Sequence, residues 1–312
     1  MKTRTTSVLF AHSRLDAIPV LAGIAQLAFL LALYFGFRRL PWWVLLPAGL
    51  IYAVGISWNI NGISHNFLHN PYFRWPPLNR AFSLLESVTL GFSQVFYEQV
   101  HKEHHMGNAD LPDEHGETID PLSIFKHGHG GKPENVWSYS LRSYFRDDPK
   151  QIYRAIRARD PREASWGIAE IVSFVAVWLA AFTFNWRFAL WFLPFYYLGH
   201  CLSYLNGYYL HYGANPHSPI AWGVSSYHTL YNWLWFNNGY HAEHHYRPKL
   251  HWTRMKQLHE KIRTQQESAH VRVIQPPHAL GFLDRHLPRF RDYPSQTAAA
   301  KGSGPRESPA AV

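Results

Sequence analysis

The chain is poor in cysteine, which limits the metal and redox sites that it can form by itself. Its 312 residues include one cysteine, Cys201, so an internal disulfide framework and any cysteine-based zinc or iron–sulfur site are excluded. The sequence also contains no CxxCH and no GxGxxG pattern. A metal site must therefore use histidine and carboxylate ligands, and we expect electrons to come from a separate protein.

Acidic residues are also scarce, with 21 Asp and Glu against 30 Lys and Arg and a formal net charge of +9. A basic chain can bind nucleic acid, but these charges lie between long apolar stretches, so we expect no nucleic-acid partner. The N-terminus lacks a short apolar core followed by a small-residue cleavage site. No cleaved signal peptide is predicted, and we expect the first apolar stretch to be retained.

Four apolar stretches are long enough to cross a bilayer, although the mean hydropathy is only −0.25. They cover residues 18–37, 43–64, 166–186 and 188–210, and each approaches the ~20 residues that a hydrocarbon core requires. Glu170 is the one formal charge among them, and residues 185–187 form a tight turn between the last two. The sequence predicts an all-α integral membrane protein with four transmembrane helices in two hairpins.

The basic residues indicate how these hairpins are oriented. Of the 30 Lys and Arg, 3 precede the first stretch, 12 lie between the hairpins and 12 follow the fourth stretch. Arg38, Arg39 and Arg187 alone fall on the opposite side. The positive-inside rule then places both termini and the middle segment in the cytosol, and we expect a multi-pass protein of a bacterial inner membrane.

The remaining segments are expected to form a cytosolic helical cap. Residues 82–100 are apolar but charged, so they are predicted to lie along the membrane interface. Residues 106–165 form a polar insert, and 255–269 an ordinary cytosolic helix. Residues 1–293 are predicted to form one domain, and the tail 294–312 to be disordered.

Nine of the 21 histidines fall at metal-ligand spacings. Pairs at i,i+4 and triplets at i, i+3, i+4 place rings on one face of a helix. The set is His65 and His69, then His101, His104 and His105, then His211, and finally His241, His244 and His245. A single HxxxH is more often chance than a site, but eight or nine imidazoles exceed what one tetrahedral zinc uses and suit two metal ions with open positions.

These motifs resemble those of the membrane fatty acid desaturase superfamily, which includes alkane hydroxylases and carotenoid ketolases. HNFLH at 65–69 matches the first histidine box, HKEHH at 101–105 the second and NNGYHAEHH at 237–245 the extended third box. His211, in GYYLHYG, matches an additional ligand at the end of the fourth helix. Alkane hydroxylases have Asn and Glu where this chain has Gly207 and Leu210, which argues against that narrower group.

The resemblance implies a desaturase-like domain over residues 1–293 whose nine histidines hold two iron ions, cycling between Fe²⁺ and Fe³⁺, with O2 as co-substrate. It also implies a lipid or acyl substrate that enters from the bilayer, and a ferredoxin or rubredoxin with its reductase as electron donor. The favoured function is fatty acyl desaturation. Hydroxylation, ketolation or other oxidation of a lipid or specialised metabolite is the alternative, and a membrane zinc hydrolase or a metal transporter is more distant.

Several polar residues outside the boxes have two interpretations each. His200 either lines a substrate tunnel or is hydrogen-bonded structurally, and Asn206 either holds a metal-bound water or packs helices together. Four more residues either orient the ligands or belong to a solvated surface: Glu103, Asn237, Asn238 and Glu243. The acidic segment 110–120 and the His127–His129 pair are predicted to form solvated loops.

Overall fold

The computed structural model describes residues 8–107 and 118–293 and consists mostly of helices. The α-helices are α1 Ala17–Gly36, α2 Trp42–Trp58, α3 His65–His69, α4 Pro76–Leu90, α5 Gln94–Gly107, α6 Val136–Arg142, α7 Pro149–Arg159, α8 Pro161–His211, α9 Thr229–Leu234, α10 His241–Tyr246 and α11 Met255–Ser268. Two short strands, β1 Val224–Ser225 and β2 Arg272–Val273, pair in parallel. The predicted tail at 294–312 and most of the acidic segment 110–120 lie outside the described residues.

Within the described part of the chain, three helical segments are long and apolar enough to cross a membrane. They span residues 14–36, 42–69 and 161–211. Large apolar side chains on them face outward, including Phe35, Ile51, Leu179 and Phe184. An exposed apolar surface of this extent suits contact with lipid rather than water.

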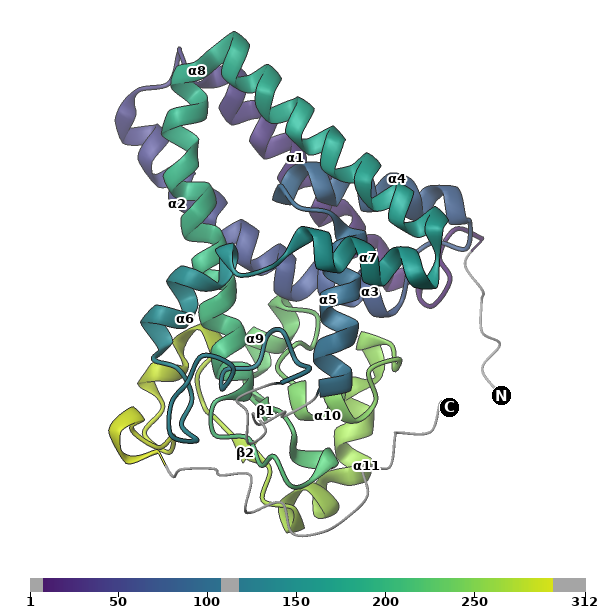
Figure 1. The fold of residues 1–312 in the computed structure, drawn as a ribbon, viewed down its shortest axis with the longest axis vertical. Helices are drawn as coiled ribbons and strands as arrows, with labels where there is room; N and C mark the ends of the chain where they lie inside the picture. The colour runs from purple at the N-terminus through teal and green to yellow at the C-terminus, as the bar shows by residue number, and fades with distance from the viewer. Residues whose placement is uncertain (1–7, 108–117, 294–312) are drawn as a thin grey trace.

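The third segment, α8, contains both of the last two predicted spans. Its 51 residues would extend about 77 Å if straight, at 1.5 Å per residue. The helix instead bends at Asn185, whose φ of −151° and ψ of 61° are not helical. Figure 1 shows α8 running up one arm, turning back at the top and descending along the other. The bend falls at the predicted turn.

The second segment ends in a π-helix that the sequence did not predict. This element, η2 Asn59–Ser64, joins α2 to α3 without a break. The amides of Asn61 and Asn66 donate to the backbone carbonyls of Ser57 and Gly62 within the widened turn. Because a π-turn changes the direction of the side chains that follow it, η2 sets where His65 and His69 point.

The stretch predicted to lie along the interface, 82–100, is divided between two helices. Helix α4 ends at Gly91, which has a φ of +75°, and α5 starts at Gln94. A Cβ on residue 91 would also lie 2.4 Å from the hydroxyl of Tyr196. Glycine is therefore required both by the left-handed backbone and by the close approach of α8.

Glu170, the charge predicted inside the third apolar stretch, is fully buried and holds α4 and α5 against α8. Its carboxylate accepts hydrogen bonds from the hydroxyls of Ser83 and Ser93 and from the backbone N–H of Val95. It thereby satisfies a free N–H in the first turn of α5. The helix that carries three of the nine histidines is thus fixed at its N-terminus.

A second buried carboxyl, Glu86, makes stability depend on pH. Burial raises its pKa from 4.5 to about 8, although the Asn59 amide, which donates to it, lowers the pKa. The folded state therefore favours the protonated form, so stability falls as pH rises from about 4.5 and the loss is complete above pH 8. We expect Glu86→Gln to raise the melting temperature at pH 9 more than at pH 5.

The control for this experiment is Glu98→Gln, because Glu98 is a partly exposed carboxylate that pairs with Lys102 on α5. Melting temperatures of the purified protein in detergent, followed by circular dichroism, measure both variants. An increase in the melting temperature of Glu86→Gln that is the same at pH 5 and pH 9 would contradict the buried-charge explanation.

The other end of the molecule is formed by shorter helices, and it includes the predicted helix 255–269 as α11 (Figure 1). The β1–β2 pair joins the chain after α8 to the chain after α11, with Val224 beside Arg272. A cluster of buried aromatic rings packs the insert onto the last turns of α8: Phe125, Tyr139, Tyr208, Tyr209, Tyr212 and Tyr293. These contacts fix the insert and the chain around Tyr293 against the last turns of α8.

Candidate metal centre

All nine predicted histidines come together, in two neighbouring groups. Within each group the candidate ligand atoms lie within 4.8 Å of one another. The first group is His65, His69, His101, His105 and His244, and the second is His104, His211, His241 and His245. Residues up to 180 positions apart in the sequence therefore form one compact cluster of imidazoles.

Four helices contribute these rings. Helix α3 gives two, α5 and α10 give three each, and the last residue of α8 gives His211. On α5 the HKEHH spacing divides its rings between the groups, since His101 and His105 join the first and His104 the second. On α10 the same spacing sends His244 to the first group and its two companions to the second. The two groups are therefore built on shared helices.

The ring nitrogens approach one another closely. In the first group the Nε2 atoms of His101 and His69 are 2.8 Å apart, those of His105 and His101 3.0 Å, and those of His244 and His105 3.1 Å. In the second group the Nε2 atoms of His241 and His211 are 3.1 Å apart. Nitrogens about 2.1 Å from one metal are separated by about 3.0 Å at right angles and about 3.4 Å in a tetrahedron. The spacing fits a metal with more than four positions.

Burial sets the protonation state of these rings. It lowers the pKa of the five ring systems on α5 and α10 for which the shift is clear, namely His101, His105, His241, His244 and His245. Each falls well below 6.5, with the other histidines lowering it further. Neutral imidazole is the form that binds metal ions, so these five rings have the required protonation state at neutral pH.

Asp120 orients one of the nine rings, and the prediction that the whole of segment 110–120 is a solvated loop is wrong for this residue. Its side chain is buried, and the Nδ1–H of His104 donates to both carboxylate oxygens at 2.9 and 3.0 Å. The backbone N–H of Leu122 donates to the same carboxylate. Nε2 of His104 is thereby directed to the second group. Five acids follow the second box in the sequence, and nothing in it distinguishes Asp120 from the others.

Glu243 braces the third box but does not touch its rings. The carboxylate is fully buried and accepts hydrogen bonds from Ser225 Oγ, Tyr227 OH and His259 Nδ1 at 2.7–2.9 Å. These bonds join α10 to β1 and α11, and the bond from His259 raises the pKa of that imidazole. The solvated-face interpretation of Glu243 is therefore wrong. Glu103, by contrast, accepts a hydrogen bond from Gln99 on its own helix face, and no bond joins it to any other described residue.

The two asparagines before the third box have separate places. Asn237 has a φ of 62° and donates to the backbone carbonyl of Trp252, so it shapes the turn before α10. Asn238 is buried and lines a cavity beside the histidines. His127 and His129 are exposed, as predicted.

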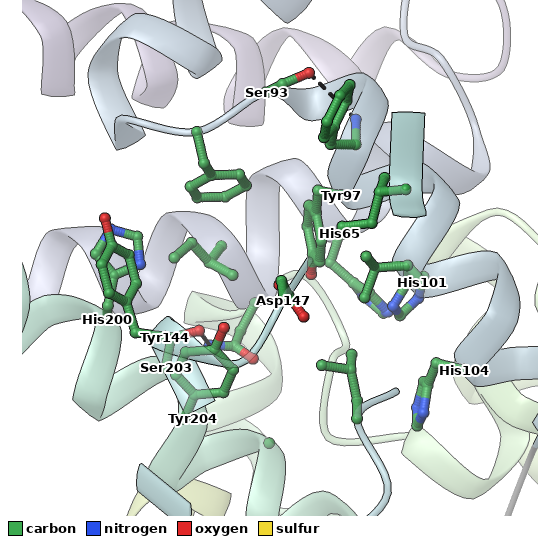
Figure 2. A pocket seen from close by; sticks show the side chains of 18 of the residues that line it. His65, Ser93, Tyr97, His101, His104, Tyr144, Asp147, His200, Ser203 and Tyr204 are labelled. Carbon is green, nitrogen blue, oxygen red and sulfur yellow. Dashed lines mark hydrogen bonds between the residues drawn. The ribbon is translucent and has the colours of Figure 1, made fainter. Parts of the chain in front are cut away.

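A cavity of about 430 Å³ adjoins both groups of histidines. His65 and His101 of the first group and His104, His211 and His241 of the second line it. His200 lines it too, and its Nε2 donates to the carbonyl of Leu90, so the ring is hydrogen-bonded structurally and also faces the cavity. Asn206 donates to Asn61 and packs α8 against η2. Figure 2 shows His65, His101 and His104 on one side of the cavity and His200 on the other.

Comparisons with known proteins agree with this geometry. The family model described as fatty acid desaturase matches residues 40–277, a range that contains all nine histidines. The chain is also 25% identical over 291 residues to a sphingolipid delta(4)-desaturase of Schizosaccharomyces pombe. That alignment covers 83% of this chain and 75% of the yeast protein.

Proposed function

Because the chain belongs to the fatty acid desaturase family, we propose that it is an O2-dependent di-iron desaturase. Membership of the family makes it a membrane oxidoreductase that catalyses lipid desaturation or a related oxidation. The proposed metal ligands are the nine histidines, five around one iron and four around the other. The proposed substrate is a lipid or another apolar chain, from which the enzyme removes two hydrogens.

The single observation that carries this proposal is the convergence of nine buried imidazoles in two groups on one cavity. Five and four donors leave open positions on a six-coordinate ion, which O2 chemistry requires. A structural zinc site would use four ligands and leave the remaining imidazoles buried without a role. The nitrogen separations of 2.8–3.1 Å also favour right-angle over tetrahedral coordination.

Two bound irons would supply reduction of O2 and removal of hydrogen from an unactivated C–H bond. The protein holds the reacting carbon beside the histidines, in a cavity whose walls are largely aromatic and apolar, including Phe92, Phe96 and Phe174. Asp120 keeps the His104 ring in one tautomer and orientation. Such positioning matters because the reaction depends on which carbon is nearest to the metals.

The proposed topology follows from the two arms of α8. With each arm as one span, the chain has four transmembrane helices in two hairpins, and the histidines lie at the cytosolic ends. Three exposed basic residues follow the third box, namely Arg247, Lys249 and Arg254. We propose that they help to dock an acidic electron donor of the ferredoxin or rubredoxin type, by electrostatic steering.

Product analysis tests the reaction type. Membranes containing the protein, supplied with reductant and a ferredoxin–reductase pair under ¹⁸O2, are compared by lipid mass spectrometry with membranes containing His104→Ala. We expect a lipid that has lost two hydrogens and carries no ¹⁸O, absent without O2 and absent in the variant. A product that carries ¹⁸O would mean that the reaction is hydroxylation rather than desaturation. The absence of any O2-dependent product would contradict the proposal.

A further inference from the structure

The backbone of helix α8 gives no reason for the glycine at position 207. Gly207 lies in the last turn of α8, where the chain is helical and φ is negative. The position therefore does not use the left-handed conformation that glycine adopts easily. Glycine inside a helix also makes the helix less stable than alanine would. Another property of glycine must account for its presence here.

Close packing between helices does not explain this glycine either. Small residues in membrane helices usually allow two helices to approach closely, and two other glycines of α8 do so. A Cβ on Gly167 would lie 2.8 Å from the Phe96 ring, and a Cβ on Gly199 would lie 2.7 Å from Ile56. A Cβ on Gly207 would meet no described atom within 4 Å, apart from the adjoining backbone of its own helix. No protein group fills the space beside Gly207.

The space beside Gly207 belongs to the cavity of about 430 Å³. Ser203 lies one turn before Gly207 and His211 one turn after it, and all three residues line this cavity. Four residues of a helix span about 6 Å, so Gly207 is that far along α8 from a candidate ligand of the second group. Figure 2 shows His200 and Ser203 on the side of the cavity opposite His104.

Apolar side chains from other parts of the fold line the same cavity. Val100 comes from α5, and Ile171 and Phe174 come from the membrane-crossing first arm of α8. A hydrocarbon chain placed among such side chains leaves water and gains dispersion contacts. The cavity therefore suits an apolar chain that runs from the first arm of α8 past Gly207 to the histidines.

We propose that Gly207 contacts the hydrocarbon chain of the substrate and determines how closely that chain approaches the second group of histidines. This inference rests on the proposed function, because it assigns a specificity-determining residue in the same site. A larger side chain at position 207 would fill the space one turn from His211 and displace the substrate chain from it. Glycine thus lowers the stability of α8 and in return leaves room for the substrate, a trade-off that is common at functional sites.

Melting temperatures distinguish this role from a packing role. We expect Gly207→Ala to raise the melting temperature of the purified protein by about 1–3 °C, because alanine favours the helix and its Cβ has room. The matched control is Gly199→Ala, which should lower the melting temperature because its Cβ would clash with Ile56. Circular dichroism in detergent measures both variants.

Binding of an apolar chain without turnover tests the contact itself. The full chain in phosphatidylcholine nanodiscs is titrated with decan-1-ol, and empty nanodiscs give the partition into lipid. We expect Gly207→Leu to weaken binding at least about tenfold, which corresponds to about two methylene groups that lose their buried position. Gly207→Ala should weaken it less, by about threefold. Ala176→Leu adds the same bulk on an exposed, lipid-facing part of α8 and should leave binding unchanged.

Three results would overturn the inference: a lower melting temperature in Gly207→Ala, decan-1-ol binding by Gly207→Leu that equals the wild type, or no binding above empty nanodiscs in the wild type. Iron content and product formation are measured on the same preparations. A wild-type protein with two irons and O2-dependent turnover, combined with any of these results, would refute this inference alone. A wild-type protein without iron whose decan-1-ol binding is lost in Gly207→Leu would refute the proposed function alone.

Discussion

Replacing His244 with alanine is expected to reduce O2-dependent turnover by at least about 1,000-fold. The side chain supplies one of five nitrogens in the first group, and its Nε2 lies 3.1 Å from that of His105. Its ring centroid is also 4.5 Å from those of His65 and His69. A factor of 1,000 corresponds to about 4 kcal/mol of transition-state stabilisation, which a lost metal ligand readily removes.

The same loss is expected for His241→Ala, because the two groups face one cavity and the proposed chemistry needs both. The matched control is His278, which is buried and has a ring centroid 6.4 Å from that of His241 but belongs to neither group. It bonds with Tyr231 and the Val224 carbonyl, so His278→Gln should lower the melting temperature and leave the metal content unchanged. Turnover by His244→Ala above a tenth of the wild-type rate would contradict the assignment.

The second large effect is expected at Asp120. Alanine here should weaken metal binding in the second group by about 10- to 100-fold, the range found when a carboxylate that orients a metal-binding histidine is removed. The reason is the pair of contacts at 2.9 and 3.0 Å to His104 Nδ1, which no other described residue replaces. Asp120→Asn should retain part of the metal affinity, since the asparagine side chain still accepts a hydrogen bond from the Nδ1–H of His104.

Competition with a chelator measures this effect, with metal counted per chain. We expect Asp120→Ala to lose one metal more readily than the other, because only the second group contains His104. The control is Glu134→Gln, which changes another buried carboxylate of the insert that pairs with Arg146 and contacts none of the nine rings. Equal release of both metals, or release from the Glu134 variant as well, would assign Asp120 a general structural role.

Much of this arrangement could be predicted because it depends on local periodicity. The HxxxH and HxxHH spacings place rings on one helix face wherever the helix is packed, and long apolar stretches identify the helices that can meet lipid. The turn at Asn185 was predictable because a polar and charged sequence interrupts two apolar stretches. Convergence of the boxes followed once each was placed at the same end of its helix.

The rest depends on contacts between distant residues. The π-turn before His65 is stabilised by amides that bond within their own helix, and nothing in the sequence distinguishes these asparagines from the others. Asp120 is one of five neighbouring acids, and only the packing of the insert selects it. Glu170 could be recognised as an unusual charge in an apolar stretch, but its hydrogen bond to the start of α5 needs the three-dimensional structure.

The most direct test of this account is the metal content of the purified protein, compared with His104→Ala and His244→Ala. We expect about two irons per chain in the wild-type protein. His244→Ala should lose the iron of the first group and His104→Ala the iron of the second, and the combined substitutions should lose both irons. Bound zinc, or iron that the two substitutions leave unchanged, would contradict the di-iron centre and with it the proposed reaction.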